Sequence, residues 1–552
     1  MAARGLPAHM YGPPVHNARV KRLKFWGWGY EDEGPDEAAR GRLAQSLGER
    51  FGCELAPVPY PRISELALPA PRVRAPSALA AILSDDPWER ARHAHGQGYR
   101  DIVRTLRREF PAPPDRVAFP ENETQVAELL EWCTRERLAA VPFGGGSSVV
   151  GGVETAIAGD YRGVVTIDLG RMDRVLEIDR ASRAARIQAG VLGPSLEDQL
   201  RPHGLTLRHF PQSFEFSSLG GWIATRSGGH FATRYTHIDE FVQGLRVVTP
   251  SGVAQTPRLP GSGAGPSPDR FFTGSEGTLG IITEAWMRLQ DRPTLRANAS
   301  VRFASFASAV AAVRALSQSG LEPANCRLLD PGEAATSAGA TGGESILVLG
   351  FESADHALDA WMARAVELCR DHGGVVPEEN VRTRGDAGAT REGAAGAWRN
   401  AFIGAPYLRD ALVSIGVFCE TFETATTWDR FERLHARVMK EVHDVLVRLC
   451  GAGSITCRFT HVYPDGPAPY YSLLAPAKRG AELELWDAVK HAAGEILASE
   501  GGTITHHHAV GRDHRKWYDR ERPEAFARAL RAAKTELDPA WVLNPGVLFD
   551  RN

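Results

Sequence analysis

The stretch Val141-Pro142-Phe143-Gly144-Gly145-Gly146-Ser147-Ser148-Val149-Val150-Gly151-Gly152 decides how the middle of the chain folds. It follows the apolar segment 138–141, which is typical of a short buried strand, so the glycines begin where a strand ends. Consecutive residues without a Cβ atom allow positive φ angles and turn successive N–H groups toward one side, where they can hold a pyrophosphate. The spacing fits neither a GxGxxG turn that opens a helix nor a Gly-Lys-Ser/Thr phosphate loop. We therefore predict a dinucleotide-binding loop of another kind, with a glycine-rich surface turn as the alternative.

The secondary structure predicted around this loop is mixed. Residues 114–120 are typical of a short strand, and Asn122 with Gln125 three residues later marks the start of a helix. That helix carries apolar residues at helical spacing from Val126 to Cys133. Three more strands are expected at 164–169, 175–178 and 185–189. This succession predicts an α+β domain and not a simple repeat of strand-helix-strand units.

Length and composition limit the class of protein. A chain of 552 residues is too long for one core and indicates two or three domains. Its 43% hydrophobic and 24% charged residues are ordinary for a globular protein. A formal charge of -3 and a pI near 6.7 argue against nucleic-acid binding, which normally needs a basic surface.

Cysteine usage and hydropathy indicate the compartment. The seven cysteines are scattered and contain no CxxC pair, so neither a disulfide framework nor a zinc site is predicted. The sequence shows no charged-then-apolar signal at its start and no apolar run long enough to span a membrane. We expect a soluble, cytoplasmic protein, and a lipid substrate would be compatible with peripheral membrane contact.

Two further clusters combine glycine with Ser or Thr donors. They are Pro211-Gln212-Ser213-Phe214-Glu215-Phe216-Ser217-Ser218-Leu219-Gly220-Gly221-Trp222-Ile223-Ala224-Thr225-Arg226-Ser227-Gly228-Gly229 and Gly274-Ser275-Glu276-Gly277-Thr278-Leu279-Gly280-Ile281-Ile282-Thr283. Their glycines permit close approach of the backbone to a ligand, although each cluster alone could be a tight turn.

The order of the three clusters resembles the FAD-binding domain of the vanillyl-alcohol oxidase superfamily, over residues 114 to about 290. That resemblance implies an α+β fold with a two-subdomain FAD-binding domain, an α/β cap (substrate) domain and helical terminal segments. It also implies an FAD lined by Pro142 to Ser148, Gln212 to Ser218, Thr225 to Gly228 and Glu276 to Ile282.

Two later segments carry candidate catalytic side chains. Pro406-Tyr407-Leu408-Arg409-Asp410 places an arginine beside an aspartate, an arrangement that is often only a surface ion pair. Segment 457–471 alternates like a strand, turns at Pro464-Asp465-Gly466 and continues into Tyr470-Tyr471, which predicts a hairpin. Its tyrosines could serve packing alone or chemistry.

The third such segment is Thr503-Ile504-Thr505-His506-His507-His508. If it continues as a strand, His506 and His508 share one face and His507 lies on the other. A three-histidine zinc site is the rival interpretation, but neighbouring strand residues do not converge easily on one ion, so no metal is predicted. Imidazoles that titrate near neutrality suit hydrogen bonding or proton transfer beside a substrate.

Taken together, these segments closely resemble the alkyldihydroxyacetonephosphate synthase (alkylglycerone-phosphate synthase) family. The resemblance also includes Trp26-Gly27-Trp28-Gly29-Tyr30, Phe422-Glu423-Thr424 and Trp428-Asp429-Arg430, and it spans most of residues 20–520. We predict four regions: a mixed and helical N-terminal segment (1–113), an FAD-binding domain (114–292), a cap or substrate domain (293–500) and a C-terminal segment that returns to the flavin (501–552).

The family resemblance implies a redox-neutral, FAD-dependent transferase of ether lipid synthesis. The enzyme would exchange the acyl group of acyl-dihydroxyacetone phosphate for a long-chain alcohol, with a non-covalently held flavin as electron sink. By position, Arg409 matches the family arginine implicated in removing the C1 proton. Tyr470 matches the acid or base for the leaving carboxylate and the entering alcohol. His507 and His508 match histidines that bind substrate, with His506 beside them.

Other features favour different functions or bear on the source. The ending Asn544-Pro545-Gly546 is more similar to flavin-dependent D-lactate dehydrogenases and glycolate oxidases. An FAD-dependent oxidase or dehydrogenase of a 2-hydroxy acid or alcohol is therefore the alternative function, and a catalytically silent flavoprotein is a third. The chain prefers Arg to Lys and ends in Phe549-Asp550-Arg551-Asn552, unlike the peroxisomal signal of eukaryotic family members. We expect a bacterial cytoplasmic protein that forms a homodimer.

Overall fold

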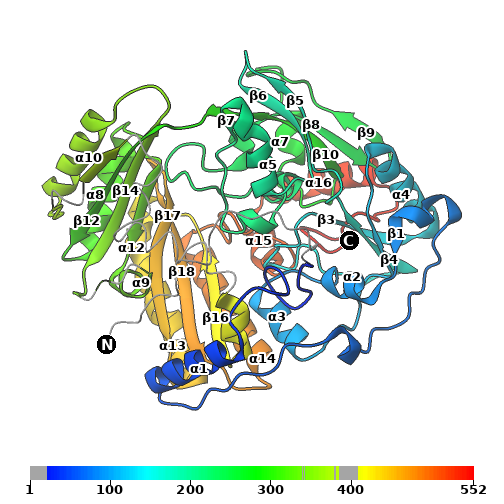
Figure 1. The fold of residues 1–552 in the computed structure, drawn as a ribbon, viewed down its shortest axis with the longest axis horizontal. Helices are drawn as coiled ribbons and strands as arrows, with labels where there is room; N and C mark the ends of the chain where they lie inside the picture. The colour runs from blue at the N-terminus through cyan, green and yellow to red at the C-terminus, as the bar shows by residue number, and fades with distance from the viewer. Residues whose placement is uncertain (1–21, 338–339, 341, 378–380, 385–407, 552) are drawn as a thin grey trace.

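The structure is a computed structural model that describes residues 22–337, 340, 342–377, 381–384 and 408–551. Two blocks of β structure lie side by side (Figure 1). The block on the right of Figure 1 holds the three glycine clusters around two small sheets, and the block on the left is a seven-stranded sheet, called here the cap sheet. Each block has its own large apolar core. The mixture of strands and helices confirms the predicted α+β class.

The first small sheet positions the first glycine cluster. Its strands run in the order β1-β2-β4-β3, with β2, β4 and β3 parallel, and α4 lies between β2 and β3 in the chain. Helix α4 begins as predicted, because the Asn122 side chain accepts the Gln125 N–H. The cluster follows β3 directly, at the carboxyl end of parallel strands, where such sheets bind ligands. The bounds are β1 (Leu83–Ser84), β2 (Arg116–Ala118), α4 (Glu123–Glu136), β3 (Leu138–Phe143) and β4 (Gly163–Asp168).

The second small sheet is antiparallel, in the order β5-β6-β10-β8-β9, and carries the other two clusters. The second cluster forms helix α6, and the third ends where β10 begins. The backbone N–H of Glu276 donates to the Ala224 carbonyl at 2.8 Å, so these two clusters are joined. The bounds are β5 (Val175–Asp179), β6 (Ala184–Gln188), α5 (Gly193–Leu200), β7 (Leu205–Thr206), α6 (Leu219–Thr225), β8 (Val242–Thr249), β9 (Gly252–Gln255), α7 (Pro268–Phe272), β10 (Ile281–Arg288) and β11 (Gln290–Asp291).

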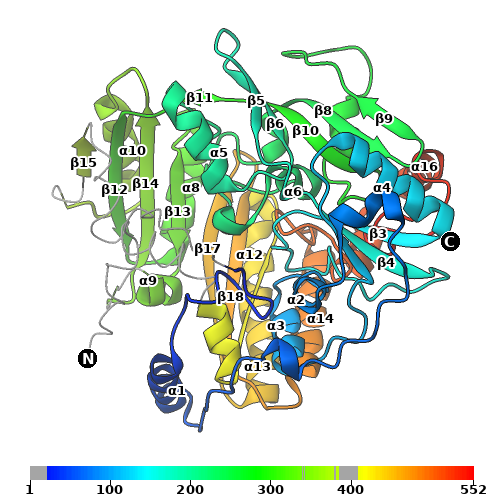
Figure 2. The ribbon, with the colours of Figure 1, turned by 45° about the vertical axis from the view of Figure 1, so that its right-hand side comes forward.

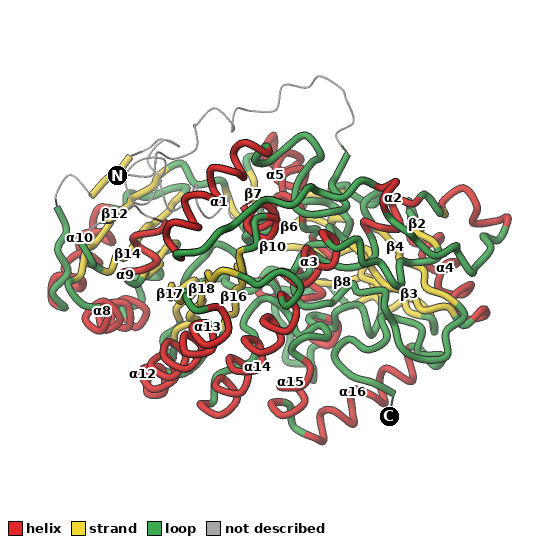
Figure 3. The backbone as a smooth tube through the Cα atoms, turned by 90° about the horizontal axis from the view of Figure 1, so that it is seen from below, coloured by secondary structure: helices red, strands yellow, loops and turns green. Residues whose placement is uncertain are grey.

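The cap sheet is antiparallel, in the order β15-β12-β14-β13-β17-β18-β16. Strands β17 and β18 form the predicted hairpin around residues 463–466. Figure 3 shows α8, α12, α13 and α14 along one face of this sheet, which leaves the other face for the cavity described below. The bounds are β12 (Leu295–Phe303), α8 (Phe306–Gln318), β13 (Asn325–Leu329), α9 (Pro331–Ser337), β14 (Ser345–Ser353), α10 (Asp359–Asp371), β15 (Val381–Arg384), β16 (Val417–Glu423), α12 (Trp428–Arg437), the π-helical turn η9 (Val438–Val442), α13 (His443–Cys450), β17 (Ser454–Val462), β18 (Pro467–Pro476) and α14 (Glu482–Glu500).

The terminal segments pack on both blocks. Helices α1 (Glu37–Phe51), α2 (Pro87–Arg92) and α3 (Tyr99–Leu106) precede the first sheet, and α15 (Arg515–Glu521) and α16 (Glu524–Leu537) follow α14. Figure 2 shows α16 and the C-terminus beside the two small sheets. There the Lys534 ammonium donates to the carbonyls of Thr278 at 2.6 Å and Leu543 at 2.9 Å, and Leu543 bridges to Ala140 of β3. None of the described helices is long and apolar enough to cross a membrane.

The first two glycine clusters pack so closely that a side chain would not fit between them. A Cβ atom at Gly145 would lie 1.6 Å from the Phe216 carbonyl oxygen, and one at Gly144 would lie 2.1 Å from the Ser218 hydroxyl. Gly146 has a φ of +72°, which residues with a Cβ rarely adopt. The glycines are thus required by packing and backbone conformation together.

We expect Gly145→Ala to destabilise the fold and to lose the yellow flavin absorbance, because its Cβ must displace the Phe216 backbone. Strain of this kind costs about 1–3 kcal/mol or more. Thermal unfolding and the absorbance of purified protein measure both effects. The control is Gly41→Ala in α1, where nothing lies within 4 Å of the added Cβ and stability should rise by about 0.5–1 kcal/mol. Equal behaviour of the two variants would contradict the packing argument.

Candidate active site

A cavity of about 520 Å³ lies between the glycine clusters and the cap sheet. All of Pro142 to Ser148 line it, together with Gln212, Ser213, Ser217, Ser218, Thr225, Ser227, Gly228, Glu276, Gly277, Gly280, Ile281 and Ile282. The predicted catalytic residues Arg409, Tyr470, His507 and His508 line the same cavity. The fold therefore brings residues that lie far apart in the sequence to the wall of one cavity.

Some predicted site residues lie behind the cavity wall. Phe216 packs against the rings of Trp28 and Tyr30, and Leu279 is fully buried in the core. Arg226 pairs with Asp239 at 3.3 Å. The predicted cofactor residues outside the lining are Phe214, Glu215, Phe216, Arg226, Thr278 and Leu279, and His506 also lies outside it.

Arg409 is presented by a helical segment at residues 408–414, and Tyr407 lies outside the described residues. The neighbouring Asp410 is buried, so the pair is no surface ion pair. The Trp28 backbone N–H donates to Asp410 at 2.8 Å, and the Lys24 ammonium lies 3.8 Å away. Burial opposes the charge of Arg409, but Glu420 and other neighbours outweigh it and raise the pKa of the guanidinium. Arg409 thus stays a cation inside the cavity.

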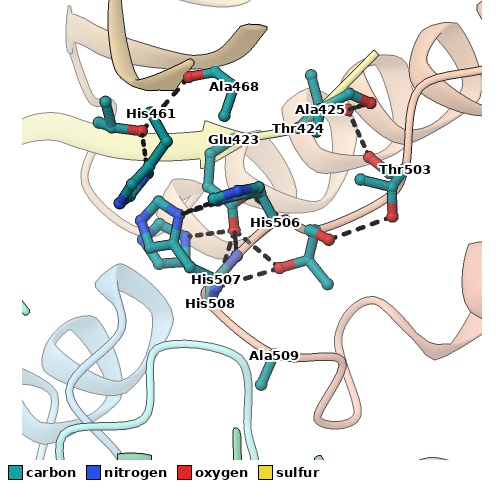
Figure 4. Close-up of polar contacts among 12 residues, drawn as sticks. Glu423, Thr424, Ala425, His461, Ala468, Thr503, His506, His507, His508 and Ala509 are labelled. Carbon is teal, nitrogen blue, oxygen red and sulfur yellow. Dashed lines mark hydrogen bonds and ion pairs between the residues drawn. The ribbon is translucent and has the colours of Figure 1, made fainter. Parts of the chain in front are cut away.

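The histidine segment is an irregular loop and not a strand, so the predicted alternation of His506, His507 and His508 is wrong. The reason is the side chain of Glu423, at the end of β16. It accepts the backbone N–H groups of the loop, which would otherwise bond to a neighbouring strand (Figure 4). Its carboxylate accepts the backbone N–H groups of all three histidines, those of His507 and His508 at 3.2 and 2.9 Å, and the Thr505 hydroxyl at 2.7 Å. Buried N–H groups need an acceptor, and here one carboxylate serves three.

Glu423 carries a negative charge under the loop. Burial alone would raise its pKa, but His508, His506 and the hydrogen bonds to Thr505 and the loop lower it to about 2. A second buried carboxylate, Glu276, accepts the N–H groups of Val510 at 2.9 Å and Gly511 at 2.8 Å, and burial raises its pKa to about 7. The loop is therefore pinned at one end by the cap sheet and at the other by the third glycine cluster.

Three side chains meet on the cavity side of this loop. The Tyr470 ring lies 6.0 Å from the His507 ring in a stacked arrangement and 5.6 Å from the His508 ring at its edge. Burial lowers the pKa of His507 well below 6.5 and also lowers that of His508. Gly228 lies so close that a Cβ there would be 3.1 Å from His507, which explains one glycine of the second cluster. Neutral imidazoles beside a phenol can accept and donate protons.

Two buried arginines that the sequence analysis missed also line the cavity. Arg458 of β17 donates to Glu333 at 2.7 Å, and its guanidinium lies 4.0 Å from the centre of the Tyr470 ring. Arg327 of β13 lies on the neighbouring strand, and burial together with Arg458 lowers its pKa to about 9. The sequence did carry a signal for Arg327, because an arginine inside the otherwise largely apolar segment 325–329 is unusual. The pair makes this end of the cavity positive.

Donor spacing alone would allow a metal ion at two places in the described part of the chain. One group is His461, His506 and His507, and the other is Glu423, His507 and His508. In the first group both ring nitrogens of His461 and both of His506 already have hydrogen-bond partners. In the second group the Glu423 oxygens accept the loop N–H groups. The existing hydrogen bonds therefore compete with a metal at both places.

The cavity fits FAD on the evidence of its first cluster. Within the described ranges no protein group accepts a hydrogen bond from the backbone N–H groups of residues 144–147. These N–H groups belong to the loop that lines the cavity and whose glycines admit no side chain, which is how a loop cradles a pyrophosphate. Ser147 and Ser148 add hydroxyl donors.

Comparisons with known proteins agree with this fit. A family described as "FAD binding domain" matches residues 114–256, and one described as "FAD linked oxidases, C-terminal domain" matches residues 292–548. A solved structure of alkyldihydroxyacetonephosphate synthase has a TM-score of 0.79 at 24% identity, covering 97% of this chain and 99% of its own. The fold and cavity therefore define a flavoprotein of the vanillyl-alcohol oxidase superfamily.

Sequence relatives narrow the assignment. Alkyldihydroxyacetonephosphate synthase of Trypanosoma brucei brucei is 30% identical over 507 residues, which is 87% of this chain and 82% of the relative. The enzyme of the same name from Caenorhabditis elegans is 29% identical and covers 96% of both chains. The chain belongs to the alkyldihydroxyacetonephosphate synthase family.

We expect Glu423→Gln to lower both the free energy of unfolding and the activity, because an amide cannot accept all the loop donors. Leaving one buried donor unpaired costs about 1–3 kcal/mol. The folded pKa of Glu423 lies below its ordinary value of 4.5, so its contribution is present above pH 4.5 and is lost as the pH falls toward 2. Denaturant unfolding at several pH values measures this, with the exposed Glu128→Gln as control. Identical acid profiles for Glu423→Gln and the wild type would contradict the assignment.

Proposed function

We propose that the protein exchanges the acyl group of acyl-dihydroxyacetone phosphate for a long-chain alcohol, using FAD, and so makes the ether bond of ether lipids. The observation that supports this most is that a single cavity is lined by both the first glycine cluster and the candidate catalytic residues. Those residues are Arg409, Tyr470 and His507, and Arg327 and Arg458 line the same cavity. The family membership supports the same enzyme class.

Arg327 and Arg458 suit the phosphate of the substrate. They lie on adjacent strands and are both buried, while Glu333 balances only part of their charge. A phosphate beside them would gain charge-assisted hydrogen bonds in a site shielded from water. The phosphate would then lie on the Tyr470 side of the cavity, because Arg458 covers that ring.

The apolar part of the lining suits the hydrocarbon chains. On the cap sheet Cys419, Leu473 and Leu474 line the cavity, and Leu412 and Leu408 of the neighbouring helical segment join them. Alkyl chains enter such a lining because burial of each methylene gains about 0.8 kcal/mol. A phosphate held by Arg327 and Arg458 and a hydrocarbon chain held on this apolar lining would together fix the direction in which acyl-dihydroxyacetone phosphate binds.

The chain's own residues would handle the protons of the exchange. Bound FAD supplies an electron sink beside the reacting carbon. The cationic Arg409 orients the substrate and stabilises the negative charge that develops when a neutral imidazole, that of His507 or His508, accepts the C1 proton. The Tyr470 hydroxyl donates a proton to the leaving carboxylate and then accepts a proton from the entering alcohol. Before the reaction, the imidazoles of His507 and His508 are neutral beside it.

Several finer properties belong to the same proposal. FAD is non-covalent, a proposal supported by the three glycine clusters, which contain no Cys, His or Tyr that could form a bond to it. The long-chain substrates support peripheral membrane contact. From the family resemblance and the Arg bias we further propose a homodimer in a bacterial cytoplasm. Acid precipitation, vesicle flotation and size-exclusion chromatography test the first three.

We expect anaerobic incubation with palmitoyl-dihydroxyacetone phosphate and a labelled long-chain alcohol to place the label in an ether product without any electron acceptor. Mass spectrometry follows the label and absorbance follows the flavin. Tyr470→Phe should keep FAD and lose transfer by about a hundredfold, as expected for a general acid or base. Bleaching of the flavin by a 2-hydroxy acid, with no ether product, would replace the transferase by the dehydrogenase. A yellow protein inert in both assays would favour the silent flavoprotein.

Arg327→Met should raise the KM for acyl-dihydroxyacetone phosphate about tenfold or more and leave the flavin content unchanged, because it removes one charged partner of the phosphate. Steady-state kinetics with variable acyl substrate measures the effect. Arg314→Met, at an exposed position on α8, makes the same chemical change away from the cavity and should behave like the wild type. An unchanged KM for Arg327→Met would place the phosphate elsewhere.

A further inference from the structure

A chain of hydrogen bonds leads from the cavity into the protein behind His507. The His507 and His506 Nδ1 atoms are 3.0 Å apart, and the His506 Nε2 atom lies 2.6 Å from the Tyr463 hydroxyl. Figure 4 draws the first of these links as a dashed line between the two rings. The Tyr463 hydroxyl also contacts the Thr236 hydroxyl at 3.0 Å. Neither His506 nor Tyr463 lines the cavity, so the function proposed above gives them no role.

The far end of this chain is a second cavity. Tyr463 lines a separate cavity of about 630 Å³. The other lining residues include some just before α12, some around the end of α14 and some of α15. Asp465 and Gly501 on its wall are exposed to solvent, as is part of the Arg520 side chain. The hydrogen bonds thus lead from the reaction cavity to a tyrosine that lines a space open to water.

Each member of the chain can both accept and donate a proton. Burial lowers the pKa of His506 and His507 well below 6.5, so both rings are neutral near pH 7, and burial raises the pKa of Tyr463. Two Nδ1 atoms that share one hydrogen bond must be one donor and one acceptor. When a proton enters at His507 and another leaves at Tyr463, both rings change tautomer together. Glu423, beneath the loop, stabilises the imidazolium formed on the way.

The proposed reaction releases one proton in each turnover. It converts acyl-dihydroxyacetone phosphate and an alcohol into the ether and a fatty acid, which near pH 7 is a carboxylate. The C–O bond to the acyl group breaks and the bond to the alkoxy oxygen forms, with no net change of oxidation state. The alcohol O–H proton is therefore released once per turnover, and a path through His507 would let it reach solvent without leaving on the fatty acid.

We propose that His506 and Tyr463 carry this proton from His507 to the second cavity. The proposal rests on the function proposed above and adds two residues to it. It assigns His506 a transfer role distinct from that of His507, although the two are neighbours in the sequence. It also explains why a tyrosine stands at the hairpin turn, where its ring packs against His506 at a centroid distance of 5.7 Å.

The test compares Tyr463→Phe and His506→Gln with the wild-type holoenzyme in H₂O and D₂O. We expect kcat to fall about tenfold and the solvent isotope effect to grow, because proton release becomes the slow step. KM values and FAD content should not change, and added imidazole buffer should restore part of kcat. Tyr471→Phe is the matched control, since this buried tyrosine of β18 contacts His435 and lies outside the chain.

Three results would overturn the relay. One is a wild-type kcat and isotope effect in Tyr463→Phe. Another is a slow variant that imidazole does not rescue, which would indicate a positioning role only. The third is a stoichiometric metal in elemental analysis that is lost in His506→Gln, because coordinated ring nitrogens cannot pass protons.

A second measurement does not depend on turnover. In ¹⁵N-histidine-labelled holoenzyme, the hydrogen-bonded ring N–H signal of His506, assigned with His506→Gln, should shift in Tyr463→Phe and stay unchanged in Tyr471→Phe. If the wild type makes no ether product, the proposed function fails and these signals alone decide the relay. Spectra that do not respond to loss of the Tyr463 hydroxyl would overturn it.

Discussion

Among the residues that the structure describes, no strand or helix pairs with the loop from Thr505 to Gly511. The loop is half-buried to buried, so its backbone N–H groups must find other acceptors. Two carboxylates provide them. Glu423, at the end of an edge strand of the cap sheet, serves the histidine end, and Glu276, in the third glycine cluster, serves the other end. Because the two acceptors belong to different blocks, the loop fixes the blocks against each other. The positions of the histidines, the cavity and the first glycine cluster all depend on the hydrogen bonds that Glu423 and Glu276 make with this loop.

The same arrangement controls the charges of the site. The cavity collects the cations Arg327, Arg409 and Arg458, while the histidines that face them are held neutral by burial. Neighbouring positive charge disfavours a charged imidazole, so the arginines and the low imidazole pKa support one another. The anionic Glu423 acts mainly on the loop backbone, while the ring nitrogens of His506 bond to His507 and Tyr463.

Much of the fold could be predicted from local pattern, because glycine clusters, capping residues and the β17–β18 hairpin are signalled by neighbours in the chain. Tyr470 and Arg409 were found by resemblance, and the structure brings them together. The histidine alternation was wrong, because the acceptor Glu423 lies more than eighty residues away and leaves no periodic trace. Arg327 escaped notice for the same reason, since its partners come from other strands and loops. The domain boundaries and the roles of the site residues stay predictions.

The contact between Leu543 and Ala140 has a consequence for how the protein is made. The first glycine cluster leaves the ribosome roughly four hundred residues before the segment that completes its surroundings, in which Asn544 donates to the Gly152 and Glu276 carbonyls. A nascent chain therefore carries an unfinished nucleotide loop through most of its synthesis. FAD would therefore bind only after the chain is released from the ribosome. A chain truncated shortly before its C-terminus would be made without bound flavin.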